Sequence, residues 1–248
     1  MGPFGRKGFF MGFTKNQHQT WKTLFDRQMP NIERFACREF KLGSTNLKLS
    51  PTTIPSLAQL NLQITPRTGW TVTRTKSRYM TCLEWFTALT RRHFPITGYI
   101  RAQEELDFTP EPDIFHDIFG HQPFMTLPLY TEIFDMFGVA YAKAKTDQQK
   151  RDLGRLAWFG YEFGLVRENG ELKAFGAGLL SSFSEIQNVN ASSVLKRPFR
   201  VEDVIAGKKP DSRREGDRVY GVVENTELFV LDSLEHYKKE LARYFKSL

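Results

Sequence analysis

The spacing of apolar positions along the chain predicts a mainly helical protein. In residues 16–40, apolar side chains from Trp21 to Met29 recur at helical intervals, and Pro30 predicts a break before a second helix. Residues 42–69 are rich in Ser, Thr, Pro and Asn, which favours irregular surface chain with one short helix. Helical spacing predicts further helices over residues 80–93, 113–120, 127–145, 147–166 and 224–248.

Short apolar runs predict a few strands among these helices. Asn169-Gly170 is a hairpin turn signal between two such runs and predicts an antiparallel pair. Residues 96–100 and 219–223 each predict one more short strand, and residues 176–190 predict a Gly-x-Gly turn followed by a short helix. The expected fold class is therefore α+β, mainly α with a few short β-strands.

Composition narrows the class of protein. The chain has 248 residues, of which 40% are hydrophobic and 25% charged, so disordered, collagen-like and coiled-coil classes are excluded. We expect one domain over residues 1–248, with residues 1–12 flexible and no membrane span. The formal net charge is +7, but the basic residues are scattered among carboxylates, so no nucleic-acid partner is expected.

Two residue types carry further information. Cys37 and Cys82 are too few to staple a chain of this size, which favours a reducing compartment and a cytoplasmic protein. Aromatic residues make up 14% of the chain, with 22 phenylalanines. This excess indicates an aromatic core or an aromatic pocket, without deciding between them.

Two of the five histidines, His116 and His121, lie five positions apart. The zinc-protease pattern H-E-x-x-H has a separation of four, which keeps both imidazoles on one helical face. A separation of five rotates the second imidazole off that face unless the helix ends between them. We expect Gly120 to end the helix in a left-handed cap and Pro123 to prevent its continuation, so that His121 returns beside His116.

Glu162 is the best candidate for a third metal ligand, because it lies in an otherwise aromatic and apolar helix. A carboxylate buried there is costly unless it is paired or binds a cation. Two imidazoles and one carboxylate form the facial triad of non-haem Fe(II) oxygenases, so Fe(II) is the first choice and Zn(II) the second. Buried core histidines and a salt-bridged Glu162 are the alternatives that the pattern leaves open.

At these residues the chain resembles the tetrahydropterin-dependent aromatic amino acid hydroxylases, most closely the short bacterial phenylalanine 4-hydroxylases that lack a regulatory domain. The resemblance spans about residues 12–230. The matching blocks are Thr20-Trp21, Arg27-Gln28, Thr68-Gly69-Trp70, Phe94-Pro95, Tyr99-Ile100-Arg101, TPEPDIFHDIFGHQP at 109–123, Trp158-Phe159, Glu162-Phe163-Gly164-Leu165 and AFGAGLLSSFSEIQ at 174–187.

The resemblance implies a role for each matching residue. His116, His121 and Glu162 would be the iron ligands and the catalytic centre. The implied substrate-binding residues are Arg101 for the α-carboxylate, Asp113 as its supporting carboxylate, Thr109, Gly178, Ser181 and Ser182 along the amino acid site, and Pro110, Trp158 and Phe163 in the aromatic-ring pocket. The implied pterin-binding residues are Trp85 or Phe86, stacked on the pterin, Asp117 near its ring and Glu185 supporting this wall.

The resemblance also implies an activity. Fe(II), O₂ and a tetrahydropterin co-substrate, such as tetrahydrobiopterin, would hydroxylate the ring of a free aromatic amino acid. Trp158 favours L-phenylalanine giving L-tyrosine, and tryptophan or tyrosine hydroxylation are the alternatives. Ala157 and the charged segment 208–218 depart from the family pattern, which bears on substrate choice and on the loop that closes the site.

Two further expectations concern assembly and class. The chain shows no long tetramerisation helix, so a monomer or a weak dimer is expected. Two other functional classes stay open: a zinc hydrolase that uses the same three ligands, and a catalytically idle protein that binds an aromatic amino acid.

Overall fold

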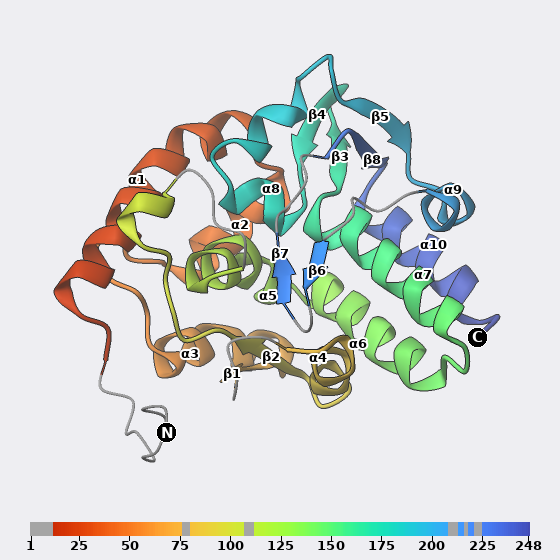
Figure 1. The fold of residues 1–248 in the computed structure, drawn as a ribbon, viewed down its shortest axis with the longest axis horizontal. Coiled ribbons are helices and arrows are strands. Elements are labelled where there is room, and N and C mark those ends of the chain that lie inside the picture. The colour runs from red at the N-terminus through yellow and green to blue at the C-terminus, as the bar shows by residue number, and fades with distance from the viewer. Residues whose placement is uncertain (1–11, 76–79, 107–111, 208–212, 216–217, 221–224) are drawn as a thin grey trace.

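The computed structural model describes residues 12–75, 80–106, 112–207, 213–215, 218–220 and 225–248 (Figure 1). The α-helices are α1 (Lys15–Phe35), α2 (Arg38–Leu47), α3 (Leu57–Thr68), α4 (Cys82–Leu89), α5 (Gln122–Met125), α6 (Pro128–Lys143), α7 (Asp147–Ala157), α8 (Ala177–Ser181), α9 (Val201–Ala206) and α10 (Leu234–Phe245). The π-helical turns are η2 (His116–His121) and η3 (Trp158–Glu162), and the 3₁₀ turns are η1 (Gln103–Glu105) and η4 (Glu185–Val189). The expectation of a mainly helical fold is confirmed.

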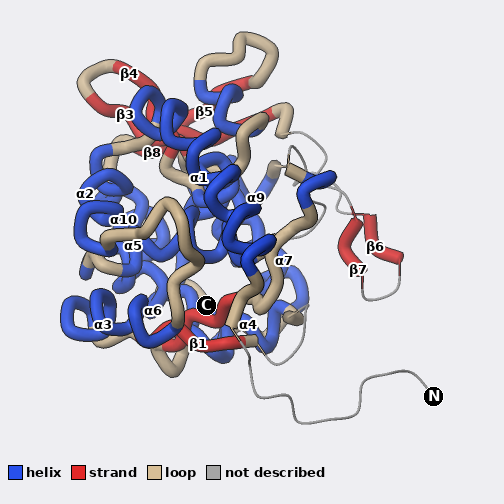
Figure 2. Tube along the Cα trace, turned by 90° about the vertical axis from the view of Figure 1, so that its left-hand side faces the viewer, coloured by secondary structure: helices blue, strands red, loops and turns tan. Residues whose placement is uncertain are grey.

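The strands are short and form separate small sheets. The strand bounds are β1 (Thr71–Arg74), β2 (His93–Ile96), β3 (Leu165–Glu168), β4 (Glu171–Ala174), β5 (Leu195–Pro198), β6 (Arg213–Glu215), β7 (Arg218–Tyr220) and β8 (Glu227–Leu231). One sheet has the order β4-β3-β8-β5, β1 pairs with β2 in parallel, and β6 pairs with β7 antiparallel. Figure 2 shows the four-stranded sheet at the top and β1 at the bottom, with helices between them.

The predicted hairpin is confirmed. Asn169 and Gly170 join β3 to β4 with positive φ angles of 50° and 84°, the left-handed region that this dipeptide favours. The segment 219–223 lies partly outside the described residues, and its described part belongs to β7.

Four element predictions are wrong. Residues 42–69, expected to be irregular with one short helix, instead contain the end of α2 and all of the 12-residue α3, because Ser56 and Gln59 cap the start of α3. Helix α1 continues through Pro30 to Phe35. Pro30 has no N–H to donate to the backbone carbonyl of Asp26, four residues earlier, but both residues are exposed, so water can solvate that carbonyl. The strand expected at 96–100 is instead β2, which ends at Ile96. The first part of the helix expected at 224–248 is instead the strand β8. This strand pairs with β3 on one side and β5 on the other, and its apolar residues are buried.

Sequence-encoded caps begin four of the helices. In each, a Ser or Thr side chain accepts a hydrogen bond from the backbone three residues later, and the Gln or Glu at that position bonds back. The pairs are Thr14 with Gln17, Ser56 with Gln59, Thr81 with Glu84, and Thr146 with Gln149.

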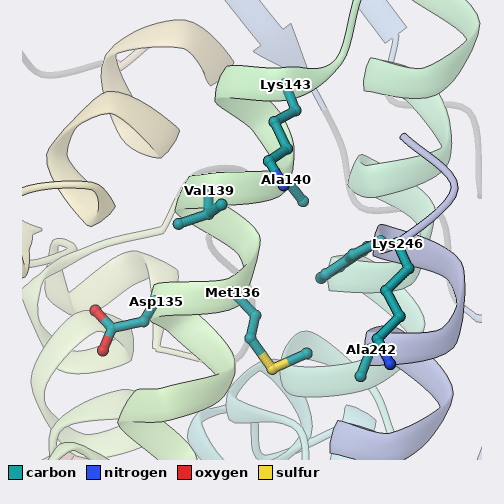
Figure 3. Close-up of a pocket in the computed structure, with 8 residues that line it drawn as sticks. Asp135, Met136, Val139, Ala140, Lys143, Ala242 and Lys246 are labelled. Carbon is teal, nitrogen blue, oxygen red and sulfur yellow. The ribbon is translucent and has the colours of Figure 1, made fainter.

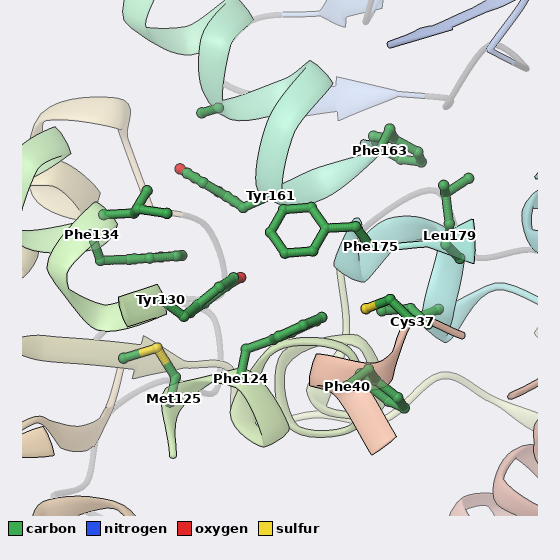
Figure 4. Packing of buried hydrophobic residues seen from close by; sticks show 14 of the residues in the cluster. Cys37, Phe40, Phe124, Met125, Tyr130, Phe134, Tyr161, Phe163, Phe175 and Leu179 are labelled. Atoms are coloured by element: carbon green, nitrogen blue, oxygen red, sulfur yellow. The ribbon is translucent and has the colours of Figure 1, made fainter. Parts of the chain in front are cut away.

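Much of the phenylalanine excess lies in the core. Phe124, Tyr130 and Phe134 form a buried row in which Phe124 stacks on Tyr130 at 4.7 Å between ring centroids (Figure 4). Phe134 lies 4.6 Å from Tyr161, whose ring centroid is 6.2 Å from that of His121. Contacts between aromatic rings therefore connect the buried core to the candidate ligand His121.

Hollows on the surface of the described residues include two away from the candidate ligands. One, of about 400 Å³, lies between α6 and α10 and is lined by residues that include Met136, Val139 and Phe245 (Figure 3). The other, of about 440 Å³, lies over α1 and α2. None of the three candidate metal ligands lines either hollow. Among the described residues, no helix is both long and apolar enough to cross a membrane.

Candidate metal centre

His116 and His121 are the first and last residues of the π-helical turn η2. A π-turn makes hydrogen bonds from residue i to residue i+5, so residues five apart lie above one another. The two imidazole centroids are 4.9 Å apart, with their planes almost perpendicular at 89°. The spacing of five therefore brings the histidines together through a widened turn.

The predicted helix break between the histidines is wrong. Gly120 does not adopt a positive φ angle, and η2 runs directly into α5, with Pro123 near its start, where a missing N–H is tolerated. Gly120 has a different purpose. A Cβ atom there would lie 2.8 Å from the carbonyl oxygen of Ala177, so only glycine lets η2 pack this closely against α8.

Glu162 is the last residue of the second π-turn, η3. Its carboxylate oxygens lie 3.6 Å from Nε2 of His116 and 3.2 Å from Nε2 of His121. One ligand atom from each of the three residues falls within 4.8 Å of the others, which is the separation that a single metal ion spans. The two π-turns thus bring the predicted triad to one point.

Ser181 sets the proton position on His116. Its hydroxyl donates to the carbonyl oxygen of Ala177 at 2.7 Å and lies 2.9 Å from Nδ1 of His116. Because the single hydroxyl proton is used on Ala177, Ser181 accepts from an Nδ1–H, and Nε2 keeps the lone pair that faces Glu162. The resemblance implied a place for Ser181 along the amino acid site, and its hydroxyl contacts the candidate ligand His116 and the backbone of α8.

The electrostatics of the site favour a neutral imidazole. Burial lowers the pKa of His116 to about 4, an effect that the Glu162 carboxylate only partly offsets. A neutral imidazole is the form that binds a metal. Two nitrogen donors and one carboxylate fit Fe(II) or Zn(II), and this donor set leaves open coordination positions.

Arg101 and Asp113 form a buried ion pair beside the start of η2. Asp113 accepts from Nε and Nη2 of Arg101 at 2.8 and 2.9 Å, and from the backbone of Arg101 and of His116. Burial acts to raise the pKa of Asp113, but the hydrogen bonds and charge of Arg101 prevail and hold it below its usual value. The predicted support of Arg101 by Asp113 is therefore seen in the geometry.

The carboxylate of Asp117 faces Thr97, the residue that directly follows β2. This carboxylate accepts from the backbone N–H of Thr97 at 2.6 Å, and Arg74 donates to the carbonyl of the same residue. Burial raises the pKa of Asp117 to about 7. A buried acid held by one backbone donor is suited to binding a polar heterocycle.

Trp158 and Phe163 form an aromatic corner on η3. Their ring centroids lie 4.4 Å apart at 36°. Gly178 makes this corner possible, because a Cβ atom there would lie 2.5 Å from Cζ of Phe163. These three residues, predicted for the amino acid site, therefore lie together.

The two residues predicted to stack on a pterin differ in their surroundings. Phe86 is 3% exposed and already stacks on Tyr141 at 4.4 Å, so its face is covered and we assign it to the core. Trp85 is only partly buried and packs edge-on against Phe94, which contacts His121 at 5.2 Å. Trp85 therefore remains the candidate.

The remaining predicted site residues have mixed outcomes. The Ser182 hydroxyl accepts from the backbone N–H of Glu185, the first residue of η4, at 3.2 Å. Glu185 is buried and accepts from two amides, Asn188 at 3.2 Å and Asn225 at 3.0 Å. Thr109 and Pro110 lie outside the described residues. The sequence analysis missed Asn225, since a single Asn before a strand carries no pattern.

Comparison with other proteins is consistent with this geometry. Residues 5–248 match the family described as biopterin-dependent aromatic amino acid hydroxylase. A phenylalanine-4-hydroxylase of Pseudomonas aeruginosa is 35% identical over 203 residues, which are 78% of this chain and 77% of that protein. The corresponding protein of Caulobacter vibrioides is 36% identical over 173 residues, or 70% of this chain and 58% of its own length.

Solved structures show the same fold. The apo structure of the cold-active phenylalanine hydroxylase from Colwellia psychrerythraea has a TM-score of 0.83 at 28% identity and covers 96% of this chain and 91% of that one. The phenylalanine hydroxylase of Chromobacterium violaceum with bound iron(III) and 7,8-dihydrobiopterin has a TM-score of 0.81 at 29% identity, covering 95% and 83%. With the family match over residues 5–248, the chain belongs to the biopterin-dependent aromatic amino acid hydroxylases.

Proposed function

We propose that this protein is an iron(II)- and tetrahydropterin-dependent monooxygenase that converts L-phenylalanine to L-tyrosine. The observation that carries the proposal is the cluster of His116, His121 and Glu162 next to an aromatic corner and a buried arginine. Relatives at 34–36% identity named as phenylalanine-4-hydroxylases support the choice of substrate.

The three ligands would hold iron, and bound iron would let O₂ react with the tetrahydropterin, which supplies two electrons, so that one oxygen atom enters the substrate ring and the other is reduced to water. Ser181 holds the His116 imidazole with Nε2 toward the metal. This support orients the ligand before any metal binds.

The chain's other residues hold the substrate. Asp113 takes Nε and Nη2 of Arg101, which leaves Nη1 to receive the substrate α-carboxylate. Trp158 and Phe163 hold the flat ring, with Gly178 leaving room for Phe163. On the pterin side we assign Trp85, Asp117 and Glu185, where flat apolar walls and buried acids suit a polar heterocycle.

Aerobic turnover with each aromatic amino acid, Fe(II) and tetrahydrobiopterin tests the proposal. We expect tyrosine from phenylalanine at the highest kcat/KM, with tryptophan as a weaker substrate. A preference for tryptophan or tyrosine would move the assignment within the family, and no product from any of the three would reject the enzyme.

Two experiments separate the other classes. Stoichiometric zinc with hydrolytic activity, in protein purified without added metal, would favour the zinc hydrolase. An idle binding protein would bind phenylalanine without turning it over. In that case Glu162→Ala would change neither the turnover nor the iron content of the protein. We expect Glu162→Ala to abolish both iron binding and turnover.

We also propose a cytoplasmic protein that is a monomer or a weak dimer. The two cysteines, Cys37 and Cys82, are both free, which fits a reducing compartment. Cell fractionation tests the location, and sedimentation velocity over a hundredfold concentration range tests the assembly.

A further inference from the structure

Asn225 joins two parts of the site that lie far apart in the sequence. It is 1% exposed and lies two residues before the start of β8. Its Oδ1 accepts from the indole Nε1–H of Trp158 at 3.2 Å, and its Nδ2 donates to Glu185 at 3.0 Å. One amide therefore bridges the aromatic corner and a buried carboxylate.

The chemistry of the two partners fixes the orientation of this amide. An indole N–H is only a donor and a carboxylate is only an acceptor, so Oδ1 must face Trp158 and Nδ2 must face Glu185. An apolar side chain at this position would serve neither partner. Aspartate would place a second carboxylate against Glu185, where like charges repel.

The backbone that follows Asn225 is held in place by strand pairing. Strand β8 pairs in parallel with β3 and with β5, so the chain directly after Asn225 is held in the middle of the sheet. Trp158 begins η3, the turn that ends in the ligand Glu162. The Trp158 ring packs against Phe163, and the Trp158 indole N–H donates to Asn225.

We propose that Asn225 is a positioning residue that holds the Trp158 indole at the angle required of the substrate-ring wall and ties that wall to Glu185. The proposal rests on the proposed function for the roles of these two partners. It predicts that Asn225 influences the choice between phenylalanine and a larger aromatic substrate, although it need not touch the substrate.

Asn188 provides a matched control. It also donates to Glu185, at 3.2 Å from within η4, whereas the indole N–H of Trp158 donates to Asn225. Removing Asn188 therefore disturbs the carboxylate alone, whereas removing Asn225 disturbs both ends of the bridge.

The hydrogen bond is tested without turnover. Full-length protein loaded with Zn(II), which is diamagnetic, is labelled with ¹⁵N at tryptophan, and the Trp158 indole signal among the 4 tryptophans is assigned by its loss in Trp158→Phe. We expect Asn225→Leu to shift this signal and to speed its exchange with water about tenfold, the loss of one buried hydrogen bond. Asn188→Ala should leave it in place.

An unchanged indole signal in folded Asn225→Leu would overturn the proposal, as would an equal shift in Asn188→Ala. If Asn225→Leu does not fold, Asn225→Ala removes the amide without adding apolar volume beside Glu185 and decides the same comparison.

Kinetics then test the effect on substrate. We expect Asn225→Ala to lower kcat/KM for phenylalanine about tenfold relative to tryptophan, and to change this ratio less than about twofold in a Trp158→Phe background, where no indole N–H remains. An equal loss in both backgrounds would contradict the role through Trp158. If the unmodified protein forms no tyrosine, the proposed function fails, while the indole signal still decides the positioning role.

Discussion

The hydroxyl of Ser181 lies 2.9 Å from Nδ1 of His116 and donates its proton elsewhere, to Ala177. This contact leaves Nε2 of His116 as the only ring nitrogen available to a metal. The metal site thus depends on a residue of α8 that is 65 positions from His116 in the sequence.

We predict that Ser181→Ala weakens Fe(II) binding by about 10- to 100-fold, the usual cost of removing such support. Ser182→Ala is the control, because that hydroxyl accepts from the backbone N–H of Glu185 and makes no hydrogen bond to a candidate metal ligand. Anaerobic titration with Fe(II) measures both affinities. Equal affinities for Ser181→Ala and the unmodified protein would show that the hydroxyl does not orient the imidazole.

Gly120 and Gly154 offer a matched pair of glycine-to-alanine substitutions. A Cβ at Gly120 would meet the Ala177 carbonyl at 2.8 Å, whereas a Cβ at Gly154 meets nothing within 4 Å. We expect Gly120→Ala to destabilise the fold by about 1–3 kcal/mol and to weaken metal binding. Gly154→Ala, inside α7, should stabilise it by about 0.5–1 kcal/mol. Urea unfolding measures both changes in stability. Changes of the same sign would contradict the prediction.

Asp113 predicts a pH dependence of stability. Its pKa is lowered in the folded state, so the stability that it contributes is present above its unfolded pKa of about 3.9 and is lost as pH falls through the folded pKa. Asp113→Asn leaves Arg101 buried without its counter-charge and should cost about 3–5 kcal/mol at pH 7.

The difference in unfolding free energy between Asp113→Asn and the unmodified protein should therefore become smaller below pH 4. Unfolding free energies at pH 7 and at pH 3 test this. A difference that stays constant across this range would mean that the charge of Asp113 contributes nothing.

The two cysteines should differ in reactivity. Cys82 is exposed, whereas Cys37 is buried and burial raises the pKa of its thiol. We expect one thiol to react rapidly with a disulfide reagent in the native protein and two to react in denaturant. Cys82→Ser should remove the rapid phase, and a rapid phase that survives this substitution would contradict the burial of Cys37.

The chemistry of the site could be predicted from sequence, but its backbone could not. Glu162 stands out because a carboxylate is costly in an aromatic helix, and that cost does not depend on backbone detail. The π-turn at His116–His121 instead depends on packing of Gly120 against Ala177, two residues far apart in the chain. Local signals at Gly120 and Pro123 therefore predicted a break where a widened turn exists.

Tertiary contacts also explain the other differences. Residues 227–231 form a strand because the sheet offers them two partners, β3 and β5, which no local pattern reveals. The resemblance implied Trp85 or Phe86 as the residue that stacks on a pterin, yet Tyr141 already stacks on the ring of Phe86. Asn225 carries no pattern at all, and only its contacts with Trp158 and Glu185 reveal it.

We infer that His116, His121 and Glu162 hold the iron of a phenylalanine hydroxylase. The most direct measurement compares tyrosine formed from L-phenylalanine, O₂ and tetrahydrobiopterin by protein loaded with one equivalent of Fe(II) and by protein loaded with one equivalent of Zn(II). We predict tyrosine from the Fe(II) protein alone. Folded, Fe(II)-loaded protein that forms no tyrosine, or equal tyrosine from both metals, would contradict the claim.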